Sequence, residues 1–210
     1  MNSHNKNIVC MGEAMAEFTR VERQKGEALY IRGLGGDTSN CAISAARQGA
    51  DVAYLSSVGN DQFGNMAMDM WSKEGIDVSN ISINPGSPTG IYFIEPAPEG
   101  RNFTYYRKGS AASEMTLTSD ARALLSGEVI LHLSAISQAI SVTAKESSFD
   151  AIDLVKQNGG MLSYDTNLRL NLWGLEEARS VINKTAAQAD ILLPSLDEAQ
   201  ILTGLNDKED

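Results

Sequence analysis

Cysteine and histidine are scarce in this sequence, since its 210 residues contain two of each. Cys10 and Cys41 stand far apart and form no close-spaced pattern of the kind that holds zinc or carries out dithiol chemistry. We expect both to be small buried residues. His132 lies inside an apolar run from Glu128 to Leu133, where a hydrogen-bonded structural imidazole is a better interpretation than a catalytic one. The sequence therefore gives no support to a zinc, dithiol or histidine-based site.

Long hydrophobic runs and an excess of basic residues are also missing. No apolar stretch is long enough to span a membrane, and the polar start Met1–Lys6 is followed by only a short apolar segment. We therefore expect no membrane partner and a cytoplasmic location. The formal net charge of −10 disfavours nucleic acid and anionic membranes as partners, because the long-range field would repel them. An anionic small substrate would need local cations.

Prolines are few, five against 18 glycines, and there is no low-complexity run or repeat. With 42% hydrophobic and 21% charged residues, the composition is that of a globular protein. The patterns predict strands at 7–11, 52–58, 129–136, 161–164 and 191–193, and helices at 38–48, 61–75, 143–157 and 175–188. This alternation predicts an α/β fold with a doubly wound, mostly parallel sheet flanked by helices, in a single domain spanning 1–210.

Two segments, residues 17–33 and 89–107, break this alternation. The second holds two β-rich runs on either side of residues 96–100. We predict that the two segments form a small antiparallel β lid inserted in the domain. Because ligands of open α/β sheets bind beyond the carboxyl ends of the strands, a lid near those ends would close over a bound molecule.

A glycine-rich run lies at the start of the helix predicted at 38–48. Gly35 and Gly36 let a ligand approach the backbone, and free N–H groups at the helix start point outward. Asn40 adds side-chain donors and an acceptor. A glycine pair alone is more often a simple turn, and nothing here matches the lysine-containing phosphate loop of many nucleotide-binding proteins.

A polar loop, Asp165-Thr166-Asn167-Leu168-Arg169, directly follows the strand predicted at 161–164. This position places Asn167 and Arg169 at the ligand-binding end of a parallel sheet. The alternative is a solvated loop in which Asp165 acts as a local cap.

A second cationic segment, residues 105–108, ends the predicted lid. Strand alternation puts Tyr105 and Arg107 on one face. The alternative makes the tyrosines cross-strand packing residues and Arg107 a charge at the rim, and for Tyr106 we adopt this structural interpretation.

In combination these motifs resemble a known family. The spacing of Gly35-Gly36-x3-Asn40, Gly49 and Gly59-Asn60-Asp61-x-Phe63-Gly64 is similar to the N-terminal signature of ribokinase-type (PfkB family) sugar kinases, although a strand-to-helix turn explains residues 59–64 by itself. The pattern Asp-x-Asn-x-Arg-x3-Trp at 165–173 resembles the same segment of 2-keto-3-deoxygluconate kinases. The resemblance implies a ribokinase-like fold and transfer of phosphate from ATP, with Mg²⁺, to a sugar acid, most closely 2-keto-3-deoxygluconate.

The resemblance also implies roles for individual residues. The implied substrate contacts are Gly35, Gly36, Asp37, Asn40, Tyr92, Tyr105, Arg107 and Arg169. An arginine fork suits a carboxylate, which a neutral hexose lacks. Asn167 and Ser195 are implied near the nucleotide or the transferred phosphate, and Glu198 is implied to act indirectly on Mg²⁺. Ser195 stands where the family usually has asparagine, and a helix capping box made by Ser195 and Glu198 would explain both residues structurally.

The family's Gly-Ala-Gly-Asp motif, whose aspartate is the catalytic base, has no match in residues 1–210. We therefore expect a C-terminally incomplete part of the fold, assign no catalytic residue, and expect this chain alone to bind sugar acid without turnover. The resemblance further implies a homo-oligomer formed through the lid. Three interpretations stay open: a sugar-acid kinase, a kinase of a neutral sugar such as fructose or ribose, and a non-catalytic sugar-acid-binding relative. Arg107 together with Arg169 favours the first over the second.

Overall fold

Five parallel strands form the central sheet of the computed structural model, which describes residues 8–22 and 27–205. The strand order is β11-β10-β9-β1-β4, and every neighbouring pair is parallel. The strands are β1 (Ile8–Met11), β4 (Val52–Leu55), β9 (Ile130–Ser134), β10 (Met161–Asp165) and β11 (Ile191–Leu193). The predicted parallel α/β sheet is confirmed.

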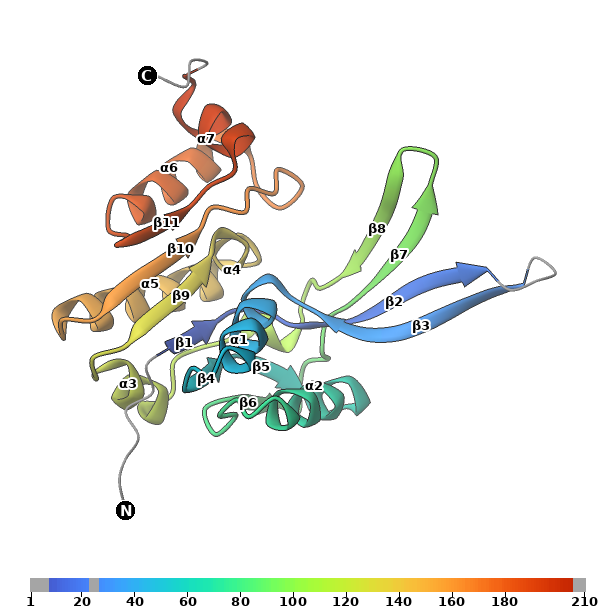
Figure 1. The fold of residues 1–210 in the computed structure, drawn as a ribbon, viewed down its shortest axis with the longest axis horizontal. Coiled ribbons are helices and arrows are strands. Elements are labelled where there is room, and N and C mark those ends of the chain that lie inside the picture. Colours follow the sequence, from blue (N-terminus) through green and yellow to red (C-terminus); the bar gives the residue numbers. More distant parts are fainter. Residues whose placement is uncertain (1–7, 23–26, 206–210) are drawn as a thin grey trace.

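Different helices cover the two faces of this sheet (Figure 1). The helices are α1 (Asp37–Arg47), α2 (Gln62–Lys73), α3 (Ser119–Leu125), α4 (Ala135–Ala139), α5 (Val142–Gln157), α6 (Leu175–Ala186) and α7 (Leu196–Thr203), with a 3-10 turn η1 (Ala111–Glu114). Val9 of β1 packs in a buried cluster with Ile152 of α5 and Ile182 of α6. The next residue, Cys10, belongs to a second cluster with Trp71 of α2. Successive residues of β1 thus face opposite helical layers, as a strand buried on both sides requires.

Two predicted strands are shorter than expected. The strand predicted at 52–58 divides into β4 and β5 (Ser57–Gly59), and β5 leaves the main sheet to pair with β6 (Ser82–Asn84). The strand predicted at 129–136 ends at Ser134, because the Ser134 hydroxyl accepts a hydrogen bond from the backbone N–H of Ile136 and caps α4. The first boundary depends on pairing with β6, 25 residues later in the sequence, and the second on a local side-chain cap, so neither follows from hydrophobic pattern.

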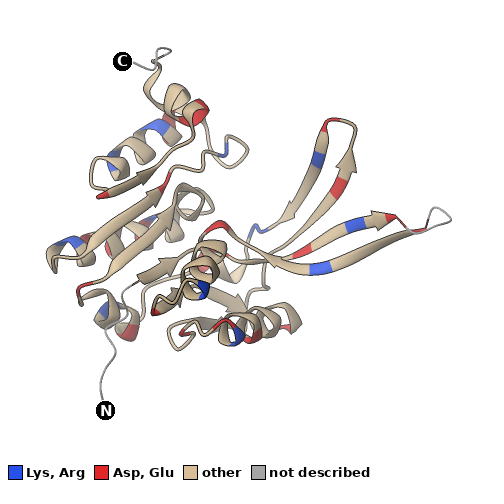
Figure 2. Ribbon diagram, in the orientation of Figure 1, with Lys and Arg blue, Asp and Glu red and all other residues tan. Residues whose placement is uncertain are grey.

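The lid is a separate four-stranded sheet that projects from the α/β body (Figure 1). Its strands are β2 (Met15–Glu22), β3 (Ala28–Gly35), β7 (Ile91–Ala97) and β8 (Gly100–Tyr106), in the order β3-β2-β7-β8. The two hairpins are antiparallel as predicted, but they join through a parallel pairing of β2 with β7 that the sequence did not indicate. Residues 23–26 of the predicted segment 17–33 lie outside the described residues. Both charge signs occur along the lid strands (Figure 2).

One carboxylate ties the lid to the body. Asp61 precedes α2, as predicted, and accepts hydrogen bonds from the backbone N–H groups of Phe63 (2.9 Å) and Gly64 (2.8 Å). Its other oxygen accepts from the N–H of Thr89, two residues before β7, at 2.8 Å. Partial burial raises the pKa of Asp61, and these backbone donors outweigh it and hold the pKa below the ordinary value. The start of α2 and the start of the second lid hairpin are therefore fixed to one side chain.

Histidine and cysteine, which are scarce in this chain, pack in the interior of the fold at His132 and Cys10. His132 is buried, and its Nδ1 lies 3.0 Å from the hydroxyl of Ser163, which confirms the expected hydrogen-bonded imidazole. Cys10 is fully buried, whereas Cys41 is only half-buried, so the expectation for the cysteines holds for the first alone. Among the described helices, none combines the length and the apolar character that crossing a membrane would need.

Candidate functional site

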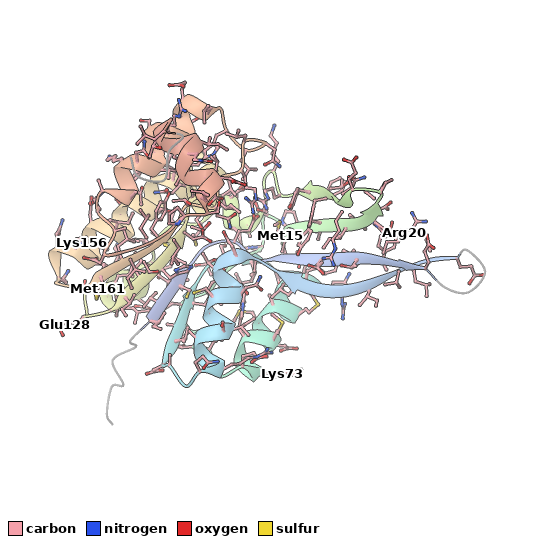
Figure 3. All side chains as sticks on the ribbon, turned by 45° about the horizontal axis from the view of Figure 1, so that its top comes forward. Met15, Arg20, Lys73, Glu128, Lys156 and Met161 are labelled. Atoms are coloured by element: carbon pink, nitrogen blue, oxygen red, sulfur yellow. The ribbon has the colours of Figure 1, made fainter. Side chains whose placement is uncertain are left out.

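A cavity of about 210 Å³ lies between residues of the lid and residues that follow the carboxyl ends of strands in the parallel sheet. Its lining includes eight residues that the sequence singled out: Gly36, Asp37, Asn40, Tyr92, Tyr105, Arg107, Asn167 and Arg169. Four further residues line it that were not singled out: Glu13, Met15, Phe103 and Ile136. In Figure 3, Met15 lies where the lid strands meet the body, and Arg20 lies farther out on the lid. The structure thus gathers residues from β1–β2, α1, the lid and the loop after β10 around one space.

The two glycines before α1 are required by close packing of the chain. A Cβ added at Gly35 would lie 1.9 Å from the hydroxyl oxygen of Tyr92. Gly36 has φ 148°, and a Cβ there would lie 2.6 Å from the backbone oxygen of Glu13. Gly36 and Asn40 line the cavity, whereas Gly35 lies behind it and makes room for Tyr92. The glycine pair is therefore not an ordinary turn.

Aromatic rings form the lid side of the cavity. Tyr92 and Tyr105 are cross-strand partners whose rings stack with centroids 5.5 Å apart. The guanidinium carbon of Arg107 lies 4.8 Å from the centroid of the Tyr105 ring, so the predicted common face of these two residues is confirmed. Tyr106 faces the other side, where its ring meets Phe93 edge-on, in agreement with the structural interpretation adopted for it.

The hydroxyl of Tyr92 is already occupied. It donates a hydrogen bond to a carboxylate oxygen of Glu17, a residue of β2 that the sequence analysis passed over. Burial, followed by this carboxylate, raises the pKa of Tyr92. Tyr92 therefore contributes its ring to the cavity lining, whereas its hydroxyl is hydrogen-bonded within the lid.

The loop after β10 is held in a special conformation. Asn167 is the one non-glycine residue with positive φ among the described residues, at 20°. Its backbone N–H donates to Asp165 Oδ1 at 3.1 Å, and its side-chain amide donates to Asp37 Oδ2 at 3.1 Å. Burial raises the pKa of Asp165, and the nearby carboxylates of Asp37 and Glu198 add to the effect. The local cap expected of Asp165 in the alternative is therefore present, but the loop is also built onto the start of α1, 130 residues away in sequence, which a solvated loop does not explain.

Arg169 retains free hydrogen-bonding capacity. Its Nη1 donates to the backbone oxygen of Leu168 at 2.9 Å and lies 3.9 Å from Glu198 Oε1. Its side chain is 49% exposed, and the guanidinium carries five N–H groups. Arg107, which directly follows lid strand β8, lines the same cavity. Two cations therefore meet there, but Glu13 and Asp37 also line it, so the local charge is more balanced than the cations alone suggested.

Ser195 and Glu198 lie outside the lining of this cavity. They form a complete capping box at the start of α7. Glu198 also accepts hydrogen bonds from the backbone N–H of Leu168 at 2.8 Å and the hydroxyl of Thr166 at 2.9 Å. Burial raises the pKa of Glu198, and these donors outweigh it and keep the pKa low. The capping box predicted for Ser195 and Glu198 is confirmed. The roles of Ser195 toward phosphate and of Glu198 toward Mg²⁺ stay predictions.

Among residues 8–22 and 27–205 there is no cluster of three or more His, Cys, Asp or Glu suited to hold a metal ion. This is compatible with Mg²⁺ bound mainly by phosphate oxygens and water, which needs one or two protein carboxylates at most. The oxygens of Glu198 already accept hydrogen bonds from three groups, Thr166, Leu168 and Ser195.

Sequence reasoning missed Glu13, although a signal was present. Glu13 follows the buried strand β1 by two residues, and polar residues at the ends of parallel strands are the ones that face ligands. The residue is 3% exposed. Met15 and Phe103 carried no signal, because an apolar residue at the margin of a strand looks like core.

Comparison with known proteins places the chain among sugar kinases. The family profile described as "pfkB family carbohydrate kinase" matches residues 5–210. A 2-dehydro-3-deoxygluconokinase of Thermoproteus tenax is 31% identical over 97% of this chain and 64% of its own length, and one of Bacillus subtilis is 35% identical over 94% and 63%. Fructokinase-1 of Oryza sativa is 31% identical, covering 100% of this chain and 66% of its own length. The chain thus spans less than two thirds of the length of these curated relatives.

Solved structures of a PfkB protein and of a sugar kinase also superpose on the chain. A PfkB protein from Polaromonas superposes with a TM-score of 0.89 at 32% identity, over 97% of this chain and 70% of that one. A sugar kinase from Pyrococcus horikoshii, solved in complex with ATP, superposes with a TM-score of 0.83 at 27% identity, over 94% of this chain and 66% of that one.

Proposed function

Because this chain belongs to the pfkB family of carbohydrate kinases, we propose that it forms the sugar-binding part of a kinase that transfers phosphate from ATP to a sugar acid. The proposed substrate is 2-keto-3-deoxygluconate, also named 2-dehydro-3-deoxygluconate, and the product its 6-phosphate. The observation that carries the proposal is that Arg107 and Arg169 line one cavity with polar groups suited to hydroxyls. Relatives named for this substrate support it.

In this proposal Arg169 binds the substrate carboxylate. A guanidinium presents two parallel N–H groups to a carboxylate, and half exposure leaves Arg169 able to do so. Arg107 and Tyr105 contact the keto-acid end from the lid, and the ring of Tyr92 packs against the sugar. The backbone at Gly36 and the side chains of Asp37 and Asn40 bind hydroxyls from the α1 side. Gly35 contributes indirectly, by making room for Tyr92.

ATP and Mg²⁺ are proposed to enter beside the loop after β10. The ATP-bound structure of the Pyrococcus sugar kinase supports ATP as donor. In this proposal Asn167 contacts the transferred phosphate, and Ser195 contacts a phosphate farther along the nucleotide. Mg²⁺ would neutralise charge on the phosphate oxygens. Since the carboxylate oxygens of Glu198 are hydrogen-bonded, Glu198 would act by orienting the 166–168 loop. We assign no general base among the described residues.

A neutral-sugar kinase is the second candidate. The fructokinase of Oryza sativa supports it, and so does the charge balance of the cavity, in which Glu13 and Asp37 accompany the two arginines. A neutral ketose would gain from the hydroxyl-binding groups without needing either arginine.

The test compares substrates with the enzyme that carries this chain at its natural length. We expect kcat/KM for 2-keto-3-deoxygluconate to exceed that for fructose and ribose by about 100-fold or more, because a desolvated carboxylate–arginine pair contributes about 2–5 kcal/mol. The amide of the sugar acid is the matched control, since it keeps the hydroxyls and loses the charge. A preference for fructose would refute the sugar-acid assignment, and absence of transfer to any of these sugars would refute the kinase proposal.

We also propose that two copies associate through the lid. The lid patch, made of Leu29 and Ile31 on β3 with Phe103 on β8, lies on one face according to the strand register. These side chains are 41%, 60% and 48% exposed. β3 is an edge strand, so a second copy can cover both the apolar side chains and the edge.

Replacing Ile31 with glutamate is expected to weaken self-association about tenfold or more, measured by light scattering across a concentration series. Tyr106→Glu, an exposed position on the opposite face of the lid, is the control and should leave association unchanged. A wild-type protein that stays monomeric, or equal effects of both variants, would contradict pairing through this face.

A further inference from the structure

Glu13 is a buried carboxylate at the base of the lid. It follows β1 and is 3% exposed. Its Oε2 lies 3.3 Å from Nε of Arg107, and its Oε1 accepts a hydrogen bond from the hydroxyl of Ser110 at 3.1 Å. Among the described residues, neither Oε2 nor the Arg107 Nε has a hydrogen-bond partner of good geometry. The two buried atoms therefore lie 3.3 Å apart as an ion pair and have no other hydrogen-bond partner among the described residues.

The surroundings leave Glu13 little freedom. A Cβ added at Gly90, which begins the second lid hairpin, would lie 3.1 Å from Glu13 Oε1. The backbone oxygen of Glu13 lies against Gly36, which lines the cavity. Glu13 thus touches the start of the second hairpin, the residues after its end and the loop before α1.

This arrangement determines which part of Arg107 faces the cavity. Arg107 has a 13% exposed side chain, lies over the Tyr105 ring and contacts Glu13 through Nε. An anchored Nε on one side and a ring on the other leave the two terminal nitrogens as the groups available to a ligand. We propose that Glu13 is a positioning residue that anchors Arg107, so that the terminal nitrogens of Arg107 meet the acid end of the sugar. This inference rests on the sugar-acid function proposed above.

The cost of burying ionised Glu13 favours a role of this residue in ligand binding over a role in stabilising the fold. Burial raises the pKa of Glu13, Arg107 and Ser110 offset only part of that rise, and the Asp37 carboxylate adds to it. A folded-state pKa above the unfolded value means that the protonated form favours folding, and stability is lost as pH rises through the folded pKa. Ionised Glu13 is therefore a net cost to the fold, as buried ion pairs often are. A carboxylate held at such a cost is expected where function uses it.

The experiment uses the full-length enzyme and four variants: Glu13→Gln, Arg107→Gln, the Glu13→Gln/Arg107→Gln double variant and Glu95→Gln. Glu95 is the matched control, because it pairs with Arg20 at the same 3.3 Å on the lid, away from the cavity. We expect Glu13→Gln to raise KM for 2-keto-3-deoxygluconate roughly tenfold to 100-fold with kcat changed much less, and Glu95→Gln to change neither. In the Arg107→Gln background, Glu13→Gln should have no further effect on KM, because its target is gone.

Two further measurements distinguish positioning of Arg107 by Glu13 from a purely structural role of Glu13. The first is the nitrogen-15 spectrum of arginine side chains, in which the Arg107 Nε–H signal should be protected from exchange in the free wild-type enzyme and lose that protection in Glu13→Gln. The second is the pH profile. The charged groups facing Glu13 are Arg107 and Asp37, and KM of the wild type should rise as pH falls toward the raised pKa of Glu13, whereas KM of Glu13→Gln should stay flat.

An unchanged KM in a folded Glu13→Gln enzyme, or additive effects in the double variant, would overturn the proposal. If Glu13→Gln is too unstable to assay, a further rise of KM in the double variant over Arg107→Gln would still overturn the proposal, and protection of the Arg107 Nε–H signal in the free wild-type enzyme would still support it, whereas an unprotected signal would overturn it. If the wild type accepts no sugar acid, the proposed function fails, and the Nε–H spectrum independently reports whether Glu13 anchors Arg107.

Discussion

Replacing Arg169 with alanine is expected to lower kcat/KM for 2-keto-3-deoxygluconate about 30- to 5,000-fold, a loss of ~2–5 kcal/mol. The reason is that the half-exposed guanidinium uses one nitrogen on Leu168 and keeps its other donors for a ligand in the cavity. Removing it leaves the substrate carboxylate without a charged partner. Steady-state kinetics on the full-length enzyme would measure the effect.

Arg169→Lys should recover only part of this loss, because an ammonium group cannot reproduce the two parallel N–H groups of a guanidinium. Arg122→Ala is the control, since Arg122 pairs with Asp150 on the surface and lies outside the cavity lining. Equal kcat/KM in wild type and a folded Arg169→Ala enzyme would return the loop after β10 to a purely structural role. A loss of the same size with fructose would show that Arg169 does not act through the carboxylate.

The second large effect is expected for Gly36→Ala. Alanine there combines two costs, because φ of 148° is unfavourable for an L side chain and the new Cβ would lie 2.6 Å from the Glu13 backbone oxygen. Backbone atoms cannot yield as a side-chain tip can. We expect the free energy of unfolding to fall by about 3–5 kcal/mol and sugar binding to be lost with it. Urea unfolding and calorimetric titration with the sugar acid would measure the two effects.

Gly49→Ala separates the two costs. Gly49 also has positive φ, at 90°, but a Cβ there meets nothing within 4 Å. It should therefore lose only about 1–2 kcal/mol, and sugar binding should remain. If both variants lose the same amount, the clash with Glu13 has no role, and the packing of the loop before α1 must be looser than the structure shows.

The extent of sequence-based prediction differs between the fold and the site. Strands β10 and β11 and helices α2, α5 and α6 are present close to where hydrophobic period and cap residues placed them. The Asp61 cap and the Ser195–Glu198 capping box also follow from sequence, because each joins residues within one helical turn. The division of the strand at 52–58 does not, since it depends on β6, whose residues lie 25 positions later in the sequence.

By itself, the sequence determined the alternation of strands and helices, the identity of the polar segments at the strand ends and, through their spacing, the family. These are properties of short segments, whose conformation depends on neighbours along the chain. Only the tertiary structure decided which of these segments share a cavity. It placed Arg107 beside buried Glu13, Asn167 on Asp37, and the Tyr92 hydroxyl on Glu17 rather than toward a ligand. It also joined the two lid hairpins through β2 and β7. Each contact links residues more than 70 positions apart, and its free energy depends on burial and charge that arise only when the sheet and the lid come together.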